Sequence, residues 1–262
     1  MKIYITTLGR LNEQVTLLNL PEDLQKQVIM VVQAHEYHAH LEKWGSIVGE
    51  VRSLDSTIDN LGPTRRQVHD WAKAEADDLK YVMLDDDLYF YERASWAAEE
   101  WHLLNASGDS VRELFAWVAG ALDTHLHVGV SGREGNNRGP NGSVETTRYM
   151  RMLCYRTDMP TEVEHGRVSG MSDFDVNLQL LRLGHASRVT YHWAQGHKTT
   201  QAPGGCSLNR THETHEREIE EMLGWHYPYA RPRDKINKTG GEFGTRRELT
   251  IYWKKALESA RG

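Results

Sequence analysis

The first ninety residues alternate between short apolar segments and segments with helical spacing, and this alternation constrains the fold more than any other feature. The segment 28–33, Val-Ile-Met-Val-Val-Gln, is almost wholly apolar, as in a strand that is buried on both faces. Further strands are expected at 2–7, 46–51 and 80–84, with helices at 36–44 and 66–76. This order predicts an α/β fold with a central, mostly parallel sheet flanked by helices.

The rest of the chain continues the pattern less regularly. The segment 131–143 is rich in Gly and Asn, which predicts a mobile loop. Helices are expected at 110–125, 176–183 and 213–223, and strands at 148–155 and 188–193. Without a repeat or a clear linker, residues 1–262 are interpreted as one domain, made of a first half (1–90), a second half (91–225) and a basic extension (226–262).

Composition excludes several classes of protein. The mean hydropathy of -0.63 and the lack of a long apolar run argue against a membrane span, and the first residues do not resemble a secretory signal. The two cysteines, Cys154 and Cys206, are far apart and suggest neither a disulfide framework nor a zinc site. A net charge of -6 argues against a surface that coats DNA as a whole. We therefore expect a cytoplasmic protein.

Three adjacent aspartates, Asp85, Asp86 and Asp87, follow the apolar segment 81–84. Ligands bind at the carboxyl ends of strands in open α/β sheets. Adjacent carboxylates repel one another unless a cation offsets them, and oxygen ligands suit Mg²⁺ or Mn²⁺ bridging a diphosphate. A solvated acidic turn is the alternative for such a triplet by itself. The preceding apolar strand favours the ligand site.

A second acidic segment opens an amphipathic helix at Ser172-Asp173-Phe174-Asp175, and the helix closes at Gly184. The strand 188–193 and His197 follow it. Together with the aspartate triplet, this order resembles the GT-A glycosyltransferases. In that family an Asp at a fixed distance before the closing glycine is the general base, which implies this role for Asp173. Family members often carry Glu before this Asp, where this chain has Ser172.

The same resemblance implies a metal site. Asp85 and Asp87 would bind Mn²⁺ or Mg²⁺, and His197 would complete the set of ligands. Asp85 is alternatively a ribose contact, and Asp86 is grouped with the donor-binding residues without a separate role. His192 competes with His197, although a lone histidine in a strand is more often structural.

The same resemblance implies that residues 1–90 form the nucleotide-sugar half and residues 91–225 the acceptor half. It also implies that two segments of the first half bind the donor, a nucleotide sugar and specifically a UDP-sugar. Thr7 and Arg10 follow the first strand. Arg65 and Arg66 end the sequence Gly-Pro-Thr-Arg-Arg at the start of a helix, where the positive helix end favours an anion such as a diphosphate. Solvated surface arginines are the alternative reading.

Over about residues 3–225 the chain resembles the phage TET-associated glycosyltransferases, which attach sugars to hydroxymethylated pyrimidines in DNA. The segments that carry this resemblance are Leu84 to Asp87, the Gly/Asn loop, Ser169 to Asp175, Gln195 to His197, and Pro203 to Ser207 followed by a His/Glu-rich helix. The resemblance implies a phage-encoded, metal-dependent enzyme that acts on DNA in the host cytoplasm.

Basic residues near the loop are compatible with a DNA acceptor. Five arginines surround or follow it: Arg133, Arg138, Arg148, Arg151 and Arg156. We predict that Arg133, Arg138 and Arg148 contact the acceptor, together with the second acidic position, Asp175. Eight bases against three acids in residues 231–255 suggest a second phosphate-binding patch. Charged loops that only confer solubility are the alternative.

Other functions remain open at this stage. A protein or glycan acceptor is compatible with the same donor site. A Mg²⁺-dependent nucleotidyltransferase or nuclease also needs clustered carboxylates, but neither explains the spacing from Asp173 to His197. With Asp173 as the base, the resemblance implies inversion at the anomeric carbon; a retaining route is the alternative if Asp173 lies too far from the acceptor.

Overall fold

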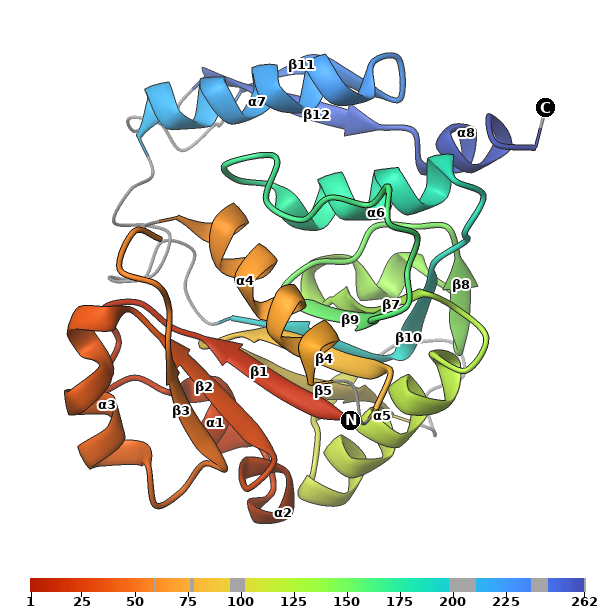
Figure 1. Cartoon of the computed structure of the whole chain (residues 1–262). Coiled ribbons are helices and arrows are strands. Elements are labelled where there is room, and N and C mark those ends of the chain that lie inside the picture. The colour runs from red at the N-terminus through yellow and green to blue at the C-terminus, as the bar shows by residue number, and fades with distance from the viewer. Residues whose placement is uncertain (59, 76–77, 95–101, 198–210, 237–244, 262) are drawn as a thin grey trace.

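A computed structural model describes residues 1–58, 60–75, 78–94, 102–197, 211–236 and 245–261 (Figure 1). The described chain forms a ten-stranded sheet with helices on both faces and a two-stranded sheet near the C-terminus. The α/β class with a central sheet flanked by helices is therefore confirmed. No helix among the described residues is long and apolar enough to cross a membrane.

The first half of the large sheet is parallel, and the second half is mixed. The order of the main path is β3-β2-β1-β4-β9-β7-β10-β5-β6, and β8 pairs with β10. The parallel strands are β1 (Lys2–Thr6), β2 (Val28–Val32), β3 (Glu50–Ser53) and β4 (Lys80–Asp85). The others are β5 (Tyr89–Arg93), β6 (Leu103–Asn105), β7 (His127–Gly132), β8 (Ser143–Glu145), β9 (Met152–Arg156) and β10 (Arg188–Gly196).

Strand β9 is inserted antiparallel between β4 and β7, whereas β10 runs parallel to β7. The carboxyl ends of β1, β4, β7 and β10 therefore lie at one edge of the sheet, together with the amino end of β9. This geometry determines which residues meet at that edge.

Helices cover the two faces of the sheet in separate cores. One core packs α1 (Val15–Asn19), α2 (Glu22–Gln25), α3 (Tyr37–Trp44) and α5 (Gly108–Ala121) on one face, and a short 3-10 helix, η1 (Ala34–Glu36), precedes α3. The other core packs α4 (Leu61–Ala74) and α6 (Ser172–Arg182) against Tyr4 and Val31. Side chains of β1 alternate between these cores, since Ile3 and Ile5 face the first one.

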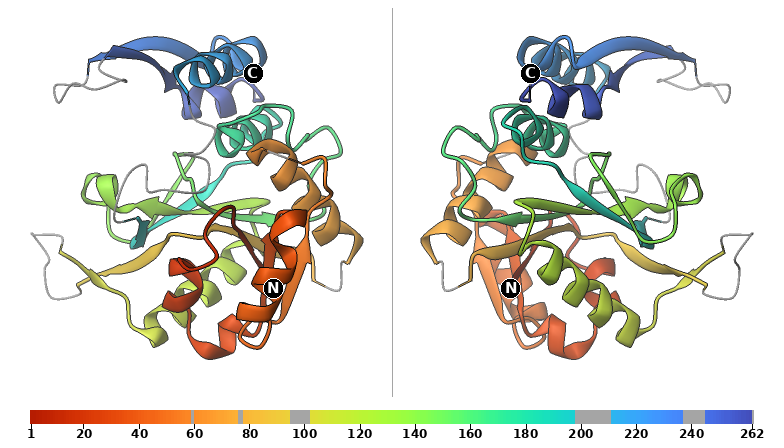
Figure 2. Two further views of the ribbon diagram at one scale, coloured as in Figure 1. Left: turned by 90° about the vertical axis from the view of Figure 1, so that its left-hand side faces the viewer. Right: turned by 90° about the vertical axis from the view of Figure 1, so that its right-hand side faces the viewer.

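A third core joins the C-terminal elements to α6. These elements are α7 (His212–His226), β11 (Ala230–Ile236), β12 (Thr245–Ile251) and α8 (Trp253–Glu258). Leu178 and Leu181 of α6 pack with Met222 of α7 and Ala256 of α8, all fully buried. Both side views show this layer stacked on α6, on the side away from the large sheet (Figure 2).

The predicted elements match unevenly. The strands at 2–7, 28–33, 80–84 and 188–193 and the helices at 36–44, 66–76, 110–125 and 213–223 correspond to observed elements. Strands β5 to β8 and the hairpin of β11 and β12 were not predicted. The hairpin strands, Ala-Arg-Pro-Arg-Asp-Lys-Ile and Thr-Arg-Arg-Glu-Leu-Thr-Ile, are so polar that their sequences resemble a basic tail.

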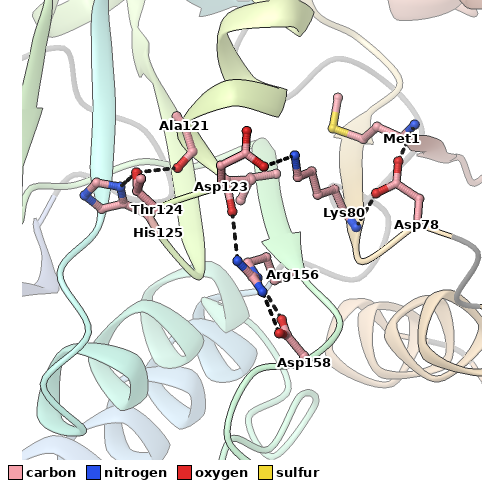
Figure 3. A network of polar contacts seen from close by, with 10 residues as sticks. Met1, Asp78, Lys80, Ala121, Asp123, Thr124, His125, Arg156 and Asp158 are labelled. Atoms are coloured by element: carbon pink, nitrogen blue, oxygen red, sulfur yellow. Dashed lines mark hydrogen bonds and ion pairs between the residues drawn. The ribbon is translucent and has the colours of Figure 1, made fainter.

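Ion pairs connect the elements at the opposite edge of the sheet, where β4 begins and β9 ends (Figure 3). The ammonium group of Lys80, at the start of β4, contacts Asp123 at 2.5 Å, and Arg156, at the end of β9, donates to Asp158 at 2.6 Å. The terminal amine of Met1 pairs with Asp78 at 2.8 Å. The five arginines near the Gly/Asn loop therefore do not share one site, because Arg156 lies at this edge, away from the aspartates.

Buried histidines predict acid sensitivity. His127 is fully buried between the hydroxyl of Tyr149 and the carbonyl of His185, both at 2.9 Å, and burial lowers its pKa to about 4. The neutral form is favoured in the folded protein. As the pH falls below the ordinary pKa of histidine, the unfolded chain takes up the proton before the folded protein does. Stability is therefore lost between about pH 6.5 and pH 4.

We expect this single group to reduce the free energy of unfolding by about 2 kcal/mol between neutral pH and pH 5. Urea unfolding at both pH values measures the loss. The His127→Asn variant should be less stable at neutral pH but lose less on acidification. An equal loss in the variant and the parent would show that His127 does not carry the effect.

Candidate active site

Several polar side chains converge at the carboxyl edge of the sheet. The triplet Asp85 to Asp87 follows β4, Arg10 follows β1, and His197 follows β10. Arg151 comes directly before β9, and its carbonyl accepts a hydrogen bond from the amide of Asp85 at 3.0 Å. Residues from four segments of the sequence therefore meet here because strand directions bring them to the same edge.

The backbone of the aspartate turn is fixed by Thr16, a fully buried residue of α1. Its hydroxyl donates to the carbonyl of Asp85 at 2.5 Å and accepts from the amide of Leu88 at 2.8 Å, and its own amide donates to the carbonyl of Asp86 at 2.9 Å. One side chain and its amide thus satisfy three backbone groups of the turn. No pattern in the sequence predicts this role of Thr16.

Asp86 is the most covered carboxylate of the triplet, with 4% of the residue exposed. Its oxygens accept from the hydroxyl of Thr7 and from the guanidinium of Arg10, both at 2.5 Å. Gln14 donates to the hydroxyl of Thr7 and to the carbonyl of Arg10, both at 2.9 Å. Burial raises the pKa of Asp86 to about 6, against the opposing effects of Thr7 and Arg10. Asp86 therefore anchors the predicted donor-binding residues Thr7 and Arg10.

Two arginines offset the charge of the acidic residues. Arg10 also contacts Asp87 at 3.0 Å. Arg65, which is buried at the start of α4, lies 3.6 Å from Asp85 and 3.7 Å from Asp173 and donates to the hydroxyl of Ser172 at 2.8 Å. Arg65 therefore connects the triplet with the start of α6.

The pKa of Asp85 is raised further than that of Asp86. Burial raises its pKa to about 7, and repulsion from Asp87, Asp86 and Asp173 adds to the rise, whereas Arg65 opposes it. Arg66, by contrast, points into solvent from the next position of α4. Of the two arginines predicted at this helix start, Arg65 is at the site.

Asp173 is held by the local geometry of α6. The helix follows Met171, which has a left-handed φ of 50°. It ends at Arg182, and Gly184 follows the capping residue Leu183 with a φ of 91°, the conformation that favours glycine after a helix. Asp173 keeps 13% of its side chain exposed. The predicted base and the aspartate triplet thus meet through Arg65, although more than eighty residues separate them.

His197 approaches the triplet from β10. Burial lowers its pKa, the charge of Arg151 lowers it further, and the charge of Asp87 opposes the shift. His197 therefore lies within electrostatic range of both residues. His192, the competing histidine, instead lies 3.3 Å from Glu92 of β5.

The side chains at this edge fit a divalent cation in their chemistry. Asp85 and Asp87 supply hard oxygens, and His197 supplies a ring nitrogen whose pKa is lowered by burial, so that its neutral form is favoured. Among the described residues, no three such side chains are grouped closely enough to hold a metal ion in this conformation.

The arginines predicted to face the acceptor have different surroundings. Arg148 is exposed, lies 5.0 Å from the ring of Phe174 and is within electrostatic range of Asp173. Arg133 lies over the ring of Tyr91 at 4.8 Å. Arg138 is exposed at the end of the 3-10 helix η2 (Arg133–Arg138). Arg148 is thus the one nearest to the predicted base.

The Gly/Asn segment is structured where a mobile loop was expected. Asn136 is fully buried, and its amide donates to the hydroxyl of Ser131 at 2.7 Å and to the carbonyl of Tyr191 at 2.8 Å. The buried Arg93 donates to the side-chain oxygen of Asn136 at 2.7 Å and to the carbonyl of Gly139 at 2.9 Å. These bonds hold η2 against β10.

Asp175 lies away from the site, contrary to its predicted contact with the acceptor. It is fully buried and accepts hydrogen bonds from Arg167 and His226, both at 2.7 Å, and from Gln179 at 2.9 Å. Asp173 and Asp175 are two positions apart on a helix, so they point in different directions. Asp175 joins α6 to α7.

Comparisons with known proteins agree with this geometry. An α/β sheet with polar side chains at the carboxyl ends of its strands is the arrangement of enzymes that bind nucleotide-like ligands. The model of the TET-associated glycosyltransferase family matches residues 1–205. The chain belongs to this family and is a glycosyltransferase.

A curated relative is the beta-glucosyl-HMC-alpha-glucosyl-transferase of enterobacteria phage T2. It is 21% identical over 214 residues, which cover 77% of this chain and 72% of the relative. Among solved structures, a putative glucose-1-phosphate thymidylyltransferase from Bacillus anthracis has a TM-score of 0.41 and 11% identity, over 88% of this chain and 98% of that one.

An inositol-1-phosphate CTP transferase from T. maritima also has a TM-score of 0.41, with 8% identity over 86% of this chain and 97% of that one. At these scores the two structures add nothing to the functional argument. The family match and the geometry of the site carry it.

Replacing Thr16 tests the support of the aspartate turn. Thr16→Val leaves the amide of Leu88 and the carbonyl of Asp85 without their partner, and we expect a loss of about 1 to 3 kcal/mol in the free energy of unfolding. Thr16→Ser keeps the hydroxyl and should recover most of it. Equal stability of the Val and Ser variants in urea unfolding would contradict this role.

Replacing Asp175 separates structure from acceptor contact. Asp175→Ala leaves Arg167 without its buried anionic partner, so we expect a loss of about 3 to 5 kcal/mol in the free energy of unfolding. Thermal and urea unfolding measure it. A variant of unchanged stability that binds acceptor less well would restore the original prediction.

Proposed function

We propose that this glycosyltransferase moves a sugar from a nucleotide sugar, specifically a UDP-sugar, to a hydroxymethylated pyrimidine in DNA, in a divalent-metal-dependent reaction. The observation that carries the proposal is the meeting of Asp85 and Asp173 around Arg65 at the carboxyl edge of the sheet, with Asp87 paired to Arg10 beside them. The phage T2 relative, named for glucosyl transfer on glucosylated HMC, supports the choice of acceptor.

The donor side of the site is built from the ends of β1 and β4. Arg10 presents a guanidinium beside Asp87, and Thr7 and Asp86 hold it in place. A positive group in this position favours the diphosphate of a nucleotide sugar. We assign Thr7, Arg10, Arg65 and Asp86 to the donor half, with Thr7 and Asp86 acting through Arg10.

Asp85, Asp87 and His197 are the residues that would hold Mn²⁺ or Mg²⁺. When bound, the cation would neutralise charge on the nucleoside diphosphate as it departs. The hard oxygens of Asp85 and Asp87, which lie on the same turn, support such a cation.

On the acceptor side, Asp173 would take the proton of the hydroxymethyl group, and the oxygen would attack the anomeric carbon, which inverts its configuration. Arg65 positions Asp173 relative to the triplet. Arg148 and Phe174 lie beside Asp173 and offer a cation and an aromatic face to a nucleotide. A base inside a duplex has to be extruded, or offered single-stranded, to reach this site.

Transfer of labelled glucose tests the acceptor and the metal together. UDP-glucose would be incubated with hydroxymethylcytosine DNA, hydroxymethyluracil DNA and unmodified DNA, with Mn²⁺ or with EDTA. We expect label only in a hydroxymethylated DNA and only with Mn²⁺. Donor hydrolysis without labelled DNA would overturn the DNA acceptor and favour a protein or glycan, and full transfer in EDTA would overturn the metal.

Variants of the two acidic groups should differ in their defects. Asp173→Asn should reduce transfer by about 10²-fold to 10⁴-fold and leave binding of UDP intact, because it removes only the proton acceptor. Asp87→Asn should reduce both transfer and Mn²⁺-dependent binding of UDP. Asp123→Asn, at the opposite edge, is the matched control and should keep full activity. Full metal-dependent transfer by Asp87→Asn would overturn the assigned site.

A further inference from the structure

Arg151 combines three features that its position in the sequence does not explain. Its backbone has a φ of 65°, in the left-handed region that non-glycine residues rarely adopt. Its carbonyl accepts the amide hydrogen bond of Asp85. Its Nη1 atom is buried and has no hydrogen-bond partner among the described residues.

The surroundings of Arg151 place its side chain at the donor edge. The charge of Arg151 acts on His197, which also feels Asp87 and Arg10. The carboxylate of Glu134 in η2 lies 3.7 Å from Nη1 of Arg151, which is within ion-pair distance but too far for a hydrogen bond. The side chain keeps 19% of its surface exposed, so it remains open to a ligand.

The unpaired Nη1 group of Arg151 reduces the stability of the fold unless an anion accepts its hydrogen bond. A buried donor without a partner reduces stability, and a left-handed backbone adds strain, so both features are expected where a ligand supplies the missing interaction. Arginine matches phosphate oxygens in geometry and charge. Arg10 already binds the carboxylates of Asp86 and Asp87, and Arg65 donates to the hydroxyl of Ser172. Of these three arginines, Arg151 has the weakest contacts within the protein.

We propose that Arg151 binds the diphosphate of the donor, and that Glu134 is its weaker partner when the donor is absent. This inference rests on the proposed nucleotide-sugar donor and names a residue for its anionic part. Arg151 would then hold the leaving group on the side of β9, opposite Arg10 on the side of β1. The carboxylate of Glu134 competes with the diphosphate for the same guanidinium.

Binding of inorganic pyrophosphate, UDP and uridine, followed by calorimetry with Mn²⁺ present, tests the proposal without requiring an acceptor. We expect Arg151→Gln to weaken UDP and pyrophosphate about tenfold or more and to leave uridine unchanged. Glu134→Gln should tighten UDP several-fold, because it removes the competing charge. Arg156→Gln, at the other end of the same strand, is the matched control and should bind as the parent does.

The outcomes separate this inference from the proposed function. Unchanged binding of UDP and pyrophosphate by Arg151→Gln would overturn the role of Arg151 even if the enzyme uses UDP-glucose. Binding of pyrophosphate that depends on Arg151, without binding of UDP, would support the subsite and overturn the uridine donor. A parent protein that binds neither ligand would overturn both. Should Arg151→Gln fold poorly, Arg151→Gly repeats the test, because glycine adopts this backbone without strain.

Discussion

Repulsion among clustered carboxylates is the constraint on which this site depends. Asp85, Asp86, Asp87 and Asp173 lie at one edge of the sheet, and Arg10 and Arg65 offset only part of their charge. Burial raises the pKa of Asp85 to about 7, Arg65 opposes the rise, and repulsion from Asp87, Asp86 and Asp173 adds to it. The backbone bonds of Thr16 hold the turn in place against this repulsion.

Strand direction explains why distant segments meet. A parallel sheet brings only residues that follow its strands to the carboxyl edge, but the reversed strand β9 brings the residues that precede it. Arg148 and Arg151 reach the site in this way, whereas Arg156, five residues after Arg151, reaches the opposite edge. One reversed strand thus divides a group of arginines that looks uniform in the sequence.

The sequence predicted the α/β class, the parallel half of the sheet and the convergence of the aspartate triplet, Asp173 and His197, because apolar periodicity and motif order are local signals. It did not predict β6 and β8, which have three residues each, or β5 and β7, in which polar and glycine residues interrupt the apolar pattern. The polar hairpin of β11 and β12 was also not predicted. Buried polar partnerships also escaped prediction. Asn136 and Arg93, like Asp175 and His226, are residue types that usually lie on the surface, and only the fold brings each pair together. The metal, the donor and the DNA acceptor stay predictions.

The layer formed by α7, the hairpin and α8 has a consequence for the evolution of the family. The family match ends at residue 205, yet Leu178 and Leu181, on the helix that carries Asp173, are buried by elements that come later in the chain. A relative without this layer has to cover the same helix with other residues or with another polypeptide. Any such cover would contact the helix that carries Asp173, the predicted base, and not the strands that precede Arg10 and the aspartate triplet.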